Sequence, residues 1–228
     1  MKCQQCGSEK LINIGANRFQ CEYCLEISIF QEVKNPQPEP ELKPTFPHHQ
    51  VEKGILNIVS GSGHGTGFII HKNGWVLTNH HVVEDLDIVN GFIVNRPHKL
   101  ELEVMGDGHH MGVDLALLKI IDPPEDLIPI GFAKTPPQIS DTVYTMGNPK
   151  NLGLSLSKGS ISRQDDKILQ CDLTVNPGNS GGPVLNESGE CVGVISYKQE
   201  DVEGYAFAVP LPLVKTFIYE FKDSIKES

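Results

Sequence analysis

The chain has 228 residues, of which 39% are hydrophobic and 21% are charged, and its formal net charge is −10. This length holds one large domain, or a medium domain with a small one. The acidic balance argues against partners such as nucleic acid or an anionic membrane surface. No run approaches the roughly 18 consecutive apolar residues of a membrane span. The first residues are polar and lack the apolar core of a signal peptide, so the sequence predicts a cytoplasmic protein.

Four cysteines lie close to the N-terminus as two C-x-x-C pairs, Cys3 with Cys6 and Cys21 with Cys24. Each pair can place two thiolates on one turn, and two such turns complete a closed tetrahedral Zn²⁺ site. Two disulfides in a secreted module are the alternative, which the polar N-terminus disfavours. Because a segment this short cannot build a sufficient core, a structural metal would stabilise it. The sequence therefore predicts a zinc ribbon over residues 1–30, in which zinc has no catalytic role.

A proline-rich segment follows, with five prolines between residues 33 and 50. Such a composition favours extended polyproline-like geometry and packs no core, so residues 31–50 are interpreted as a linker. His48 and His49 lie in it. They are better read as a solvated pair than as metal ligands.

Short β-rich runs broken by Gly, Asn, Asp and Pro begin at residue 51. Asn73-Gly74 between two such runs is typical of a hairpin turn. Many short strands with few helical runs between them indicate an all-β sandwich or a pair of barrels. The expected strands are Gly67–Ile70, Trp75–Thr78, Ile88–Val94, Leu100–Val104, Leu115–Ile121, Thr142–Met146, Leu169–Leu173, Gly182–Leu185, Cys191–Ser196 and Tyr205–Val209.

The last segment has a different period. Val214, Phe217, Ile218, Phe221 and Ile225 recur at steps of three and four, which predicts a helix docked on the second barrel. The two remaining cysteines, at positions 171 and 191, have no metal spacing and are interpreted as buried free thiols.

Ser180 lies between glycines in the segment Asn176–Leu185. Such a turn presents a hydroxyl and bare backbone N–H groups at one place, which is what acyl transfer to a serine requires. An ordinary tight turn is the alternative. A nucleophilic serine also needs a base and a carboxylate, and the sequence offers His80 or His81 after a strand and Asp114 before another. The order His, Asp, Ser differs from that of α/β-hydrolases and subtilisins.

Six motifs in this order resemble the trypsin-like serine proteases of the HtrA (Deg) family, from about residue 51 to 220. They are Gly65–Ile70, Val76–Val83, Asp114–Lys119, Gly147–Pro149, Gly178–Pro183 and Gly204–Pro210. The resemblance implies a mainly β protease domain over residues 51–228, with two antiparallel six-stranded β-barrels, an active site in the cleft between them and a C-terminal helix.

The resemblance also implies the roles of individual residues. Its register makes His81 the general base rather than His80, Asp114 the carboxylate that orients it, and Ser180 the nucleophile. The backbone N–H groups of Gly178 and Ser180 would form the oxyanion hole.

Two further expectations follow from the resemblance. Digestive relatives carry an aspartate where this chain has Asn179, and that aspartate pairs with a freshly cleaved N-terminus, so we expect activity here without proteolytic activation. The specificity pocket would be lined by a set of residues without an acidic member, which favours small or medium aliphatic side chains before the scissile bond. This set is Val175, Ile195, Ser196, Tyr197 and Ala206.

The chain departs from the family in its ends. Relatives commonly carry PDZ domains after the protease domain, and about 45 residues after Ser180 leave no room for one. We expect the zinc ribbon to recruit protein or peptide substrates instead, and trimers are expected by resemblance alone. A catalytically silent, chaperone-like binding module is the alternative function. A nucleic-acid-binding ribbon is disfavoured because its face has no basic excess.

Overall fold

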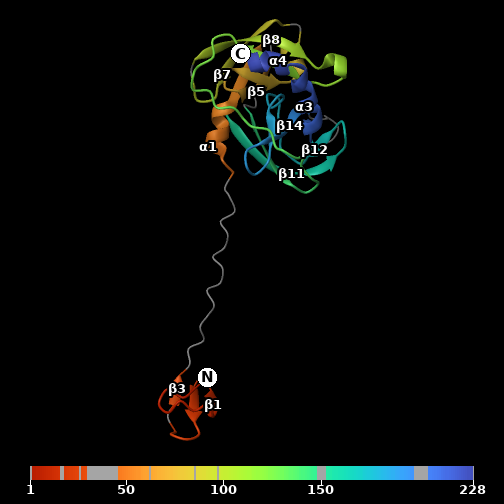
Figure 1. Cartoon of the computed structure of the whole chain (residues 1–228). Coiled ribbons are helices and arrows are strands. Elements are labelled where there is room, and N and C mark those ends of the chain that lie inside the picture. Colours follow the sequence, from red (N-terminus) through yellow and green to blue (C-terminus); the bar gives the residue numbers. More distant parts are fainter. Residues whose placement is uncertain are drawn as a thin grey trace. The chain divides into compact units, whose positions relative to one another are not determined.

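The computed structural model describes residues 2–15, 18–25, 27–29, 46–61, 63–84, 86–96, 98–147, 153–197 and 205–227. The chain divides into two compact units, Met1–Lys43 and Pro44–Ser228. Figure 1 traces both along the sequence.

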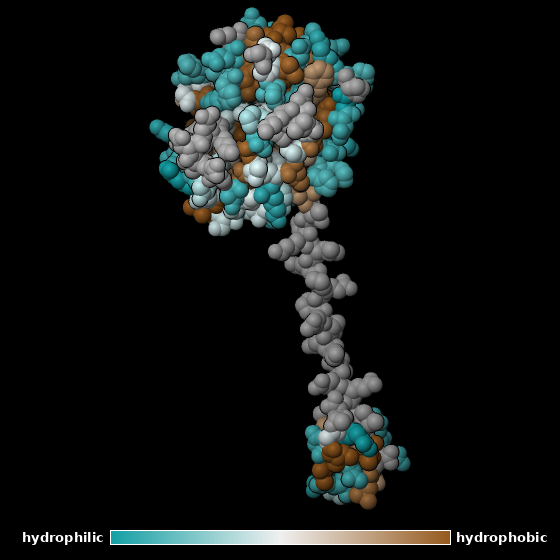
Figure 2. Space-filling view, turned by 180° about the vertical axis from the view of Figure 1, so that it is seen from behind, coloured by the Kyte–Doolittle hydropathy of each residue, from teal (hydrophilic) through white to brown (hydrophobic). Residues whose placement is uncertain are grey.

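The small unit contains an antiparallel sheet in the order β1 (Leu11–Gly15), β2 (Arg18–Cys21), β3 (Ile27–Ile29). Before the sheet, Gly7 adopts a φ of 74° and its N–H bonds to the Cys3 carbonyl oxygen, which closes the turn between the first two cysteines. Hydrophobic residues remain at its surface (Figure 2). The side chains of Tyr23 and Leu25 are among those that are exposed.

The large unit begins with α1 (His48–Val51) and the 3₁₀ turn η1 (Glu52–Gly54), and it then forms two closed six-stranded antiparallel barrels. The first barrel has the strand order β4 (Ile55–Ser60), β5 (Gly63–His71), β6 (Trp75–Thr78), β9 (Ala116–Ile120), β8 (Lys99–Asp107), β7 (Ile88–Ile93). Asn73-Gly74 makes the expected hairpin turn between β5 and β6, with Gly74 at a φ of 88°.

The second barrel has the order β10 (Thr142–Gly147), β11 (Ser155–Gln164), β12 (Leu169–Cys171), β15 (Ala206–Pro210), β14 (Cys191–Tyr197), β13 (Pro183–Leu185). The two barrels lie next to each other in Figure 1. The predicted mainly β fold with two six-stranded barrels is thereby confirmed.

Each barrel has its own buried apolar cluster, and a third cluster joins them. This third cluster contains Phe68 and Leu117 from the first barrel together with Met146 and Val194 from the second. Because apolar burial is the main favourable term in folding, this shared core fixes the barrels relative to each other. The surface side chains at the border between the two barrels are therefore held in fixed positions relative to one another.

The predicted terminal helix is present as two segments, α3 (Leu211–Glu220) and α4 (Lys222–Glu227), which are separated at Phe221. Helix α3 packs on β14 and β15 of the second barrel. The helices also reach the first barrel: His110 Nε2 lies 3.1 Å from Glu220 Oε2, and the Phe221 ring lies against Gly106 of β8. We call this pair of contacts the terminal clasp.

The start of the large unit differs from the predicted linker boundary. Phe46 is buried and its ring stacks on Tyr144 with centroids 4.1 Å apart, and helix α1 contains His48 and His49. Phe46 and Val51 therefore anchor this segment on the barrels, because the aromatic residue two positions before the helix finds a partner that local composition does not reveal. Most of the segment predicted as linker lies outside the described residues.

Candidate active site

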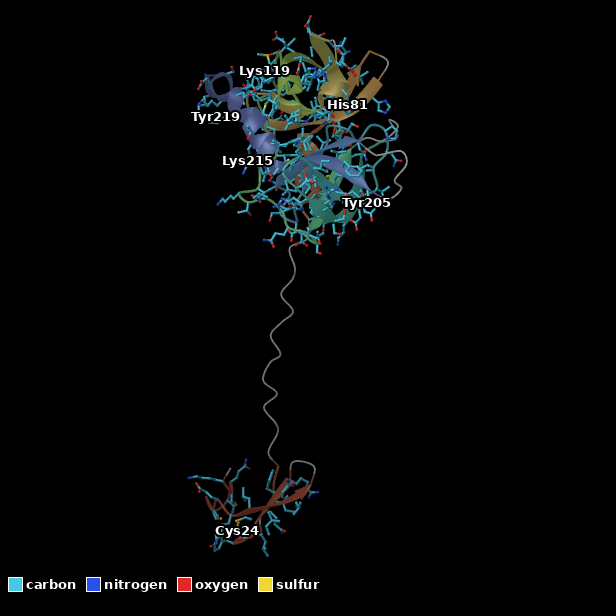
Figure 3. The ribbon with its side chains drawn as sticks, turned by 90° about the vertical axis from the view of Figure 1, so that its right-hand side faces the viewer. Cys24, His81, Lys119, Tyr205, Lys215 and Tyr219 are labelled. Carbon is cyan, nitrogen blue, oxygen red and sulfur yellow. The ribbon has the colours of Figure 1, made fainter. Side chains whose placement is uncertain are left out.

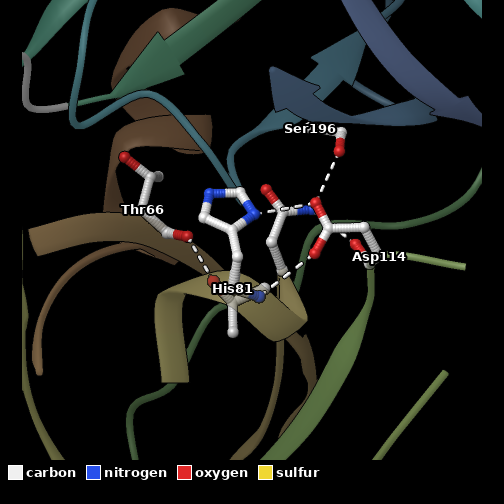
Figure 4. Close-up of polar contacts among 6 residues, drawn as sticks. Thr66, His81, Asp114 and Ser196 are labelled. Carbon is white, nitrogen blue, oxygen red and sulfur yellow. Dashed lines mark hydrogen bonds and ion pairs between the residues drawn. The ribbon is translucent and has the colours of Figure 1, made fainter. Parts of the chain in front are cut away.

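Strand pairing in the first barrel brings His81 and Asp114 together. Thr78 at the end of β6 pairs with Ala116 at the start of β9. The helical turn α2 (His80–Val83) follows the first of these residues and Asp114 precedes the second, so both side chains leave the sheet at the same edge. His81 Nδ1 lies 2.8 Å from Asp114 Oδ2, and the His81 backbone N–H donates to Asp114 Oδ1 at 3.1 Å (Figure 4).

This contact sets the charge state of both groups. The hydrogen bond with Asp114 raises the pKa of His81 above its usual value, although burial acts in the opposite direction. Burial alone would raise the pKa of Asp114, but hydrogen bonds from His81 and Ser196 outweigh it and hold the pKa below its usual value. With Asp114 ionised at neutral pH and accepting a hydrogen bond from the Nδ1–H group, neutral His81 presents the lone pair of Nε2.

Ser196, which the sequence motifs assign to the expected specificity pocket, also contacts Asp114. Its hydroxyl, at the end of β14 in the second barrel, donates to Asp114 Oδ2 at 2.5 Å (Figure 4). Asn79 completes the support by donating from Nδ2 to the Asp114 carbonyl oxygen at 2.7 Å. Asp114 is therefore held from both barrels.

The loop that carries Ser180 is bonded to the first barrel through Thr66. The Thr66 N–H donates to the Ser180 carbonyl oxygen at 2.8 Å, and the Thr66 hydroxyl donates to the Gly178 carbonyl oxygen at 2.6 Å. The Thr78 hydroxyl in turn donates to the Thr66 carbonyl oxygen at 2.7 Å. Gly181 follows at a φ of 84°, where a Cβ atom would collide with Thr66 and Thr78. This close approach explains the glycine after the serine.

Ser180 lies beside the helical turn that carries His81. A Cβ atom on Gly65 would lie 2.7 Å from Val82 and 3.2 Å from the Ser180 carbonyl oxygen, so both flank this glycine. Within the described part of the chain, the Ser180 hydroxyl makes no hydrogen bond to His81. Likewise, neither the Gly178 nor the Ser180 backbone N–H has an acceptor among the described residues. These two donors are thus available to a ligand.

The residues expected to line a specificity pocket have different surroundings. Val175, Ile195 and Ala206 belong to the apolar core of the second barrel, and Ser196 bonds to Asp114. The backbone of Tyr197 ends β14, and its side chain lies outside the described residues. A pocket built from this set stays a prediction.

His80, the neighbour of His81, has a separate partner. Its Nδ1 lies 3.7 Å from Asp107 Oδ2 and its ring lies beside that of His109, with centroids 5.6 Å apart. Figure 3 places His81 on the first barrel near the border with the second. His80 therefore lies near the carboxylate of Asp107, whereas His81 contacts that of Asp114.

The four cysteines of the small unit form one cluster, the group of possible metal ligands found in the described residues. No disulfide joins them, and their sulfur atoms lie within 4.8 Å of one another. Cys3 Sγ lies 3.5 Å from Cys24 Sγ, and Cys6 Sγ lies 3.6 Å from Cys21 Sγ. A tetrahedral site with metal–sulfur bonds of about 2.3 Å has sulfur atoms about 3.8 Å apart, whereas a disulfide needs about 2.05 Å. The cluster thus fits a metal.

The other two cysteines are free and buried, as expected from the sequence. Burial raises the pKa of both Cys171 and Cys191 to about 12, so these thiols stay protonated and unreactive.

A two-barrel fold with a hydrogen-bonded His–Asp pair beside a glycine-flanked serine defines the trypsin-like class of peptidase domains. Residues 65–194 match the family model of the trypsin-like peptidase domain, and the chain belongs to this family.

Individual relatives show which members of this family the chain is similar to. The chain is 34% identical over 158 residues to a protein of Pseudomonas putida named "Probable periplasmic serine endoprotease DegP-like", covering 64% of this chain and 32% of the relative. A protein of the same name from Brucella suis is 34% identical over 166 residues, covering 68% and 32%. The chain thus spans about a third of the length of these curated relatives.

A solved structure agrees with these relatives. The crystal structure of the serine endoprotease from Yersinia pestis superimposes with a TM-score of 0.69 at 31% identity, covering 76% of this chain and 65% of that one. The resemblance to the HtrA (Deg) proteases that the sequence motifs indicated is confirmed.

The expected cytoplasmic location is contradicted, because the relatives are named as periplasmic proteins. The expectation depended on the polar first residues, whose composition does not determine where the protein is located. Of the helices that the structure describes, none is long and apolar enough to cross a bilayer.

Proposed function

We propose that this protein is a serine endopeptidase that hydrolyses exposed or unfolded protein segments. The observation that carries the proposal is the hydrogen-bonded pair of His81 and Asp114 beside the Ser180 loop, within a trypsin-like peptidase domain. In this reading His81 is the general base, Asp114 its orienting carboxylate and Ser180 the nucleophile.

The reaction would proceed through an acyl-enzyme. His81 Nε2 takes the Ser180 proton while the serine oxygen attacks the peptide carbonyl carbon, and the N–H groups of Gly178 and Ser180 stabilise the oxyanion. His81 then gives the proton to the leaving amine, and water repeats the sequence to release the acid. Asp114 holds the imidazole in the required tautomer and stabilises its protonated form throughout.

The test is cleavage of a fluorogenic peptide or an unfolded protein by the purified chain and by a Ser180→Ala variant. We expect the variant to lose at least about a thousandfold in kcat. Ser188→Ala, at an exposed turn between β13 and β14, is the matched control and should retain activity. Equal activity of the wild type and the Ser180→Ala variant would exclude Ser180 as the nucleophile.

The preference before the scissile bond is proposed to be for small or medium aliphatic residues, since none of Val175, Ile195, Ser196, Tyr197 and Ala206 is acidic. Cleavage of a peptide library followed by mass spectrometry tests this preference. Dominant cleavage after Lys or Arg would contradict it.

The cysteine cluster is proposed to hold a structural Zn²⁺ through Cys3, Cys6, Cys21 and Cys24. Four thiolates leave no open position, so such an ion would stabilise the small unit and take no part in hydrolysis. Metal analysis of the purified chain, with Cys6→Ala as the control, decides whether zinc is present.

We further propose that the small unit recruits the substrate or a partner, which raises the effective concentration at the barrels. Because the larger unit begins at Pro44, the informative deletion removes residues 1–43. Cleavage of a short peptide should be retained and cleavage of a natural protein substrate weakened. Equal loss on both substrates would reject recruitment. Trimer formation stays a prediction that sedimentation of the full chain tests.

A latent or silent binding module is the second candidate. It is favoured by one observation, that no hydrogen bond joins Ser180 to His81 in the described residues. In the absence of substrate such bonds are often long, so this geometry alone does not exclude activity. A fluorophosphonate probe that labels Ser180 supports the endopeptidase, and an unlabelled folded protein supports the silent module.

A further inference from the structure

A cavity of about 390 Å³ lies against Asp114. Its walls come from the loop Met111–Asp114, from the β11–β12 turn, from Ser196 and β15 in the second barrel, and from Leu213 on α3. Neither His81 nor Ser180 belongs to its lining, nor does the glycine loop between residues 176 and 180. It is therefore distinct from the place where a peptide bond would be cleaved, and we call it the rear cavity.

The carboxylate of Asp114 has acceptor capacity left for a ligand. Its oxygens offer about four lone-pair positions. The described residues use three of them: Oδ2 accepts from His81 and Ser196, and Oδ1 accepts from the His81 backbone N–H. The side chain is also 31% exposed. A donor that enters the rear cavity thus meets an ionised carboxylate with an open acceptor position.

The rest of the cavity wall is mainly apolar. Val113 and Phe207 contribute from the two barrels, and Ile168 and Leu213 contribute from the β11–β12 turn and α3. Lys167 also belongs to the lining, but no ion pair joins it to Asp114 among the described residues. A negative group surrounded by apolar side chains selects a ligand with a positive end and an apolar body.

We propose that the rear cavity binds a small organic cation with an apolar body, such as an alkylammonium, and that occupancy lowers the rate of the proposed peptidase. A cation beside Asp114 competes electrostatically with protonated His81, which forms during the reaction. Because the cavity lies apart from the reacting serine, such a ligand lowers kcat and leaves KM for a short peptide unchanged. This effect on rate rests on the proposed function, whereas the binding itself does not.

Binding is measured first, on the full-length Ser180→Ala protein by calorimetry or ligand-detected NMR. n-Hexylammonium is the probe, n-butylammonium tests the apolar contribution, and hexanoate tests the charge. We expect about fourfold tighter binding for each added methylene group, and no binding of hexanoate. Equal binding of hexanoate and hexylammonium, or none of either, would overturn the proposal.

Variants locate the site. Leu213→Trp fills the rear cavity and should weaken hexylammonium binding at least tenfold, whereas Tyr219→Trp on the exposed face of the same helix should not change it. Lys167→Gln removes a like charge and should strengthen binding about two- to fivefold. Binding that both tryptophan variants leave unchanged would place the ligand elsewhere and reject the site.

The kinetic arm uses the wild-type chain and a short peptide. A fall in kcat at constant KM with hexylammonium, absent in Leu213→Trp, is the expected result. A rise in KM alone would mean competition at the substrate cleft and would contradict the proposed coupling. If the protein binds hexylammonium but cleaves no peptide, the proposed function fails and the binding site stands.

Discussion

Thr66 offers the sharpest test of how the barrels hold the Ser180 loop. Its side chain is fully buried, and its hydroxyl supplies the hydrogen bond given to the Gly178 carbonyl oxygen at 2.6 Å. Thr66→Val keeps the shape of the side chain and removes this donor. The Gly178 carbonyl is then left without its partner in a buried place, which costs about 1–3 kcal/mol of unfolding free energy.

That free energy has two readouts. For a domain of this size, about 1–3 kcal/mol lowers the melting temperature by roughly 2–12 °C. The backbone N–H of Gly178 is also an expected oxyanion donor, so a change in the geometry of this loop lowers kcat/KM. If the full 1–3 kcal/mol is lost from transition-state stabilisation, kcat/KM falls between about 5-fold and 150-fold. Calorimetry and peptide hydrolysis measure the two effects separately.

Thr145 in β10 provides the matched control. It is as buried as Thr66, but its hydroxyl has no hydrogen-bond partner among the described residues. Thr145→Val should therefore be neutral or slightly stabilising, because it removes an unsatisfied polar group. If Thr66→Val and Thr145→Val gave the same melting temperature and the same kcat/KM, the argument that the Thr66 hydroxyl holds the loop would be wrong.

Four further predictions concern the His–Asp pair and the cysteine cluster. Ser196→Ala removes one donor to a partly exposed carboxylate, so kcat should fall about two- to tenfold with little change in KM, and unchanged kinetics would contradict this role. Since Asp114, and more weakly Glu84, raise the pKa of His81, the acid limb of kcat/KM should lie above pH 6.5, and Glu84→Gln should move it to lower pH, as rate profiles will reveal. In unfolding measurements the same raised pKa stabilises the fold at low pH, and this contribution is lost as the pH rises through it. Removal of metal by a chelator should unfold the small unit and spare cleavage of a short peptide, which circular dichroism and activity together decide.

The sequence predicts most strands of the barrels because their signals are local. The runs on either side of Asn73-Gly74 are nearly continuous apolar segments, and a recognisable turn joins them. Strand β11 has no such signal: its sequence is rich in serine and mostly exposed, and it becomes a strand through pairing with β10. The break between α3 and α4 at Phe221 was also not foreseen, since the apolar period continues across it.

The candidate site likewise has some residues that local motifs predict and some contacts that they do not. His81, Asp114 and Ser180 lie in motifs whose neighbours identify them, and the first two meet as expected. The contact of Ser196 with Asp114 joins residues 82 positions apart, and the rear cavity depends on how the Met111–Asp114 loop lies against β15 and α3. Such features follow from the packing of distant segments, which no local pattern encodes.

The terminal clasp has a consequence for the synthesis of the protein. His81 and Asp114 belong to the first barrel and Ser180 to the second, while the clasp residues Glu220 and Phe221 follow every barrel strand in the sequence. Translation runs from the N-terminus, so the residues of the clasp are synthesised after every strand of both barrels. A nascent chain at the ribosome therefore carries both halves of the candidate site before it can add the clasp to the contacts that the shared core and Thr66 make between the barrels.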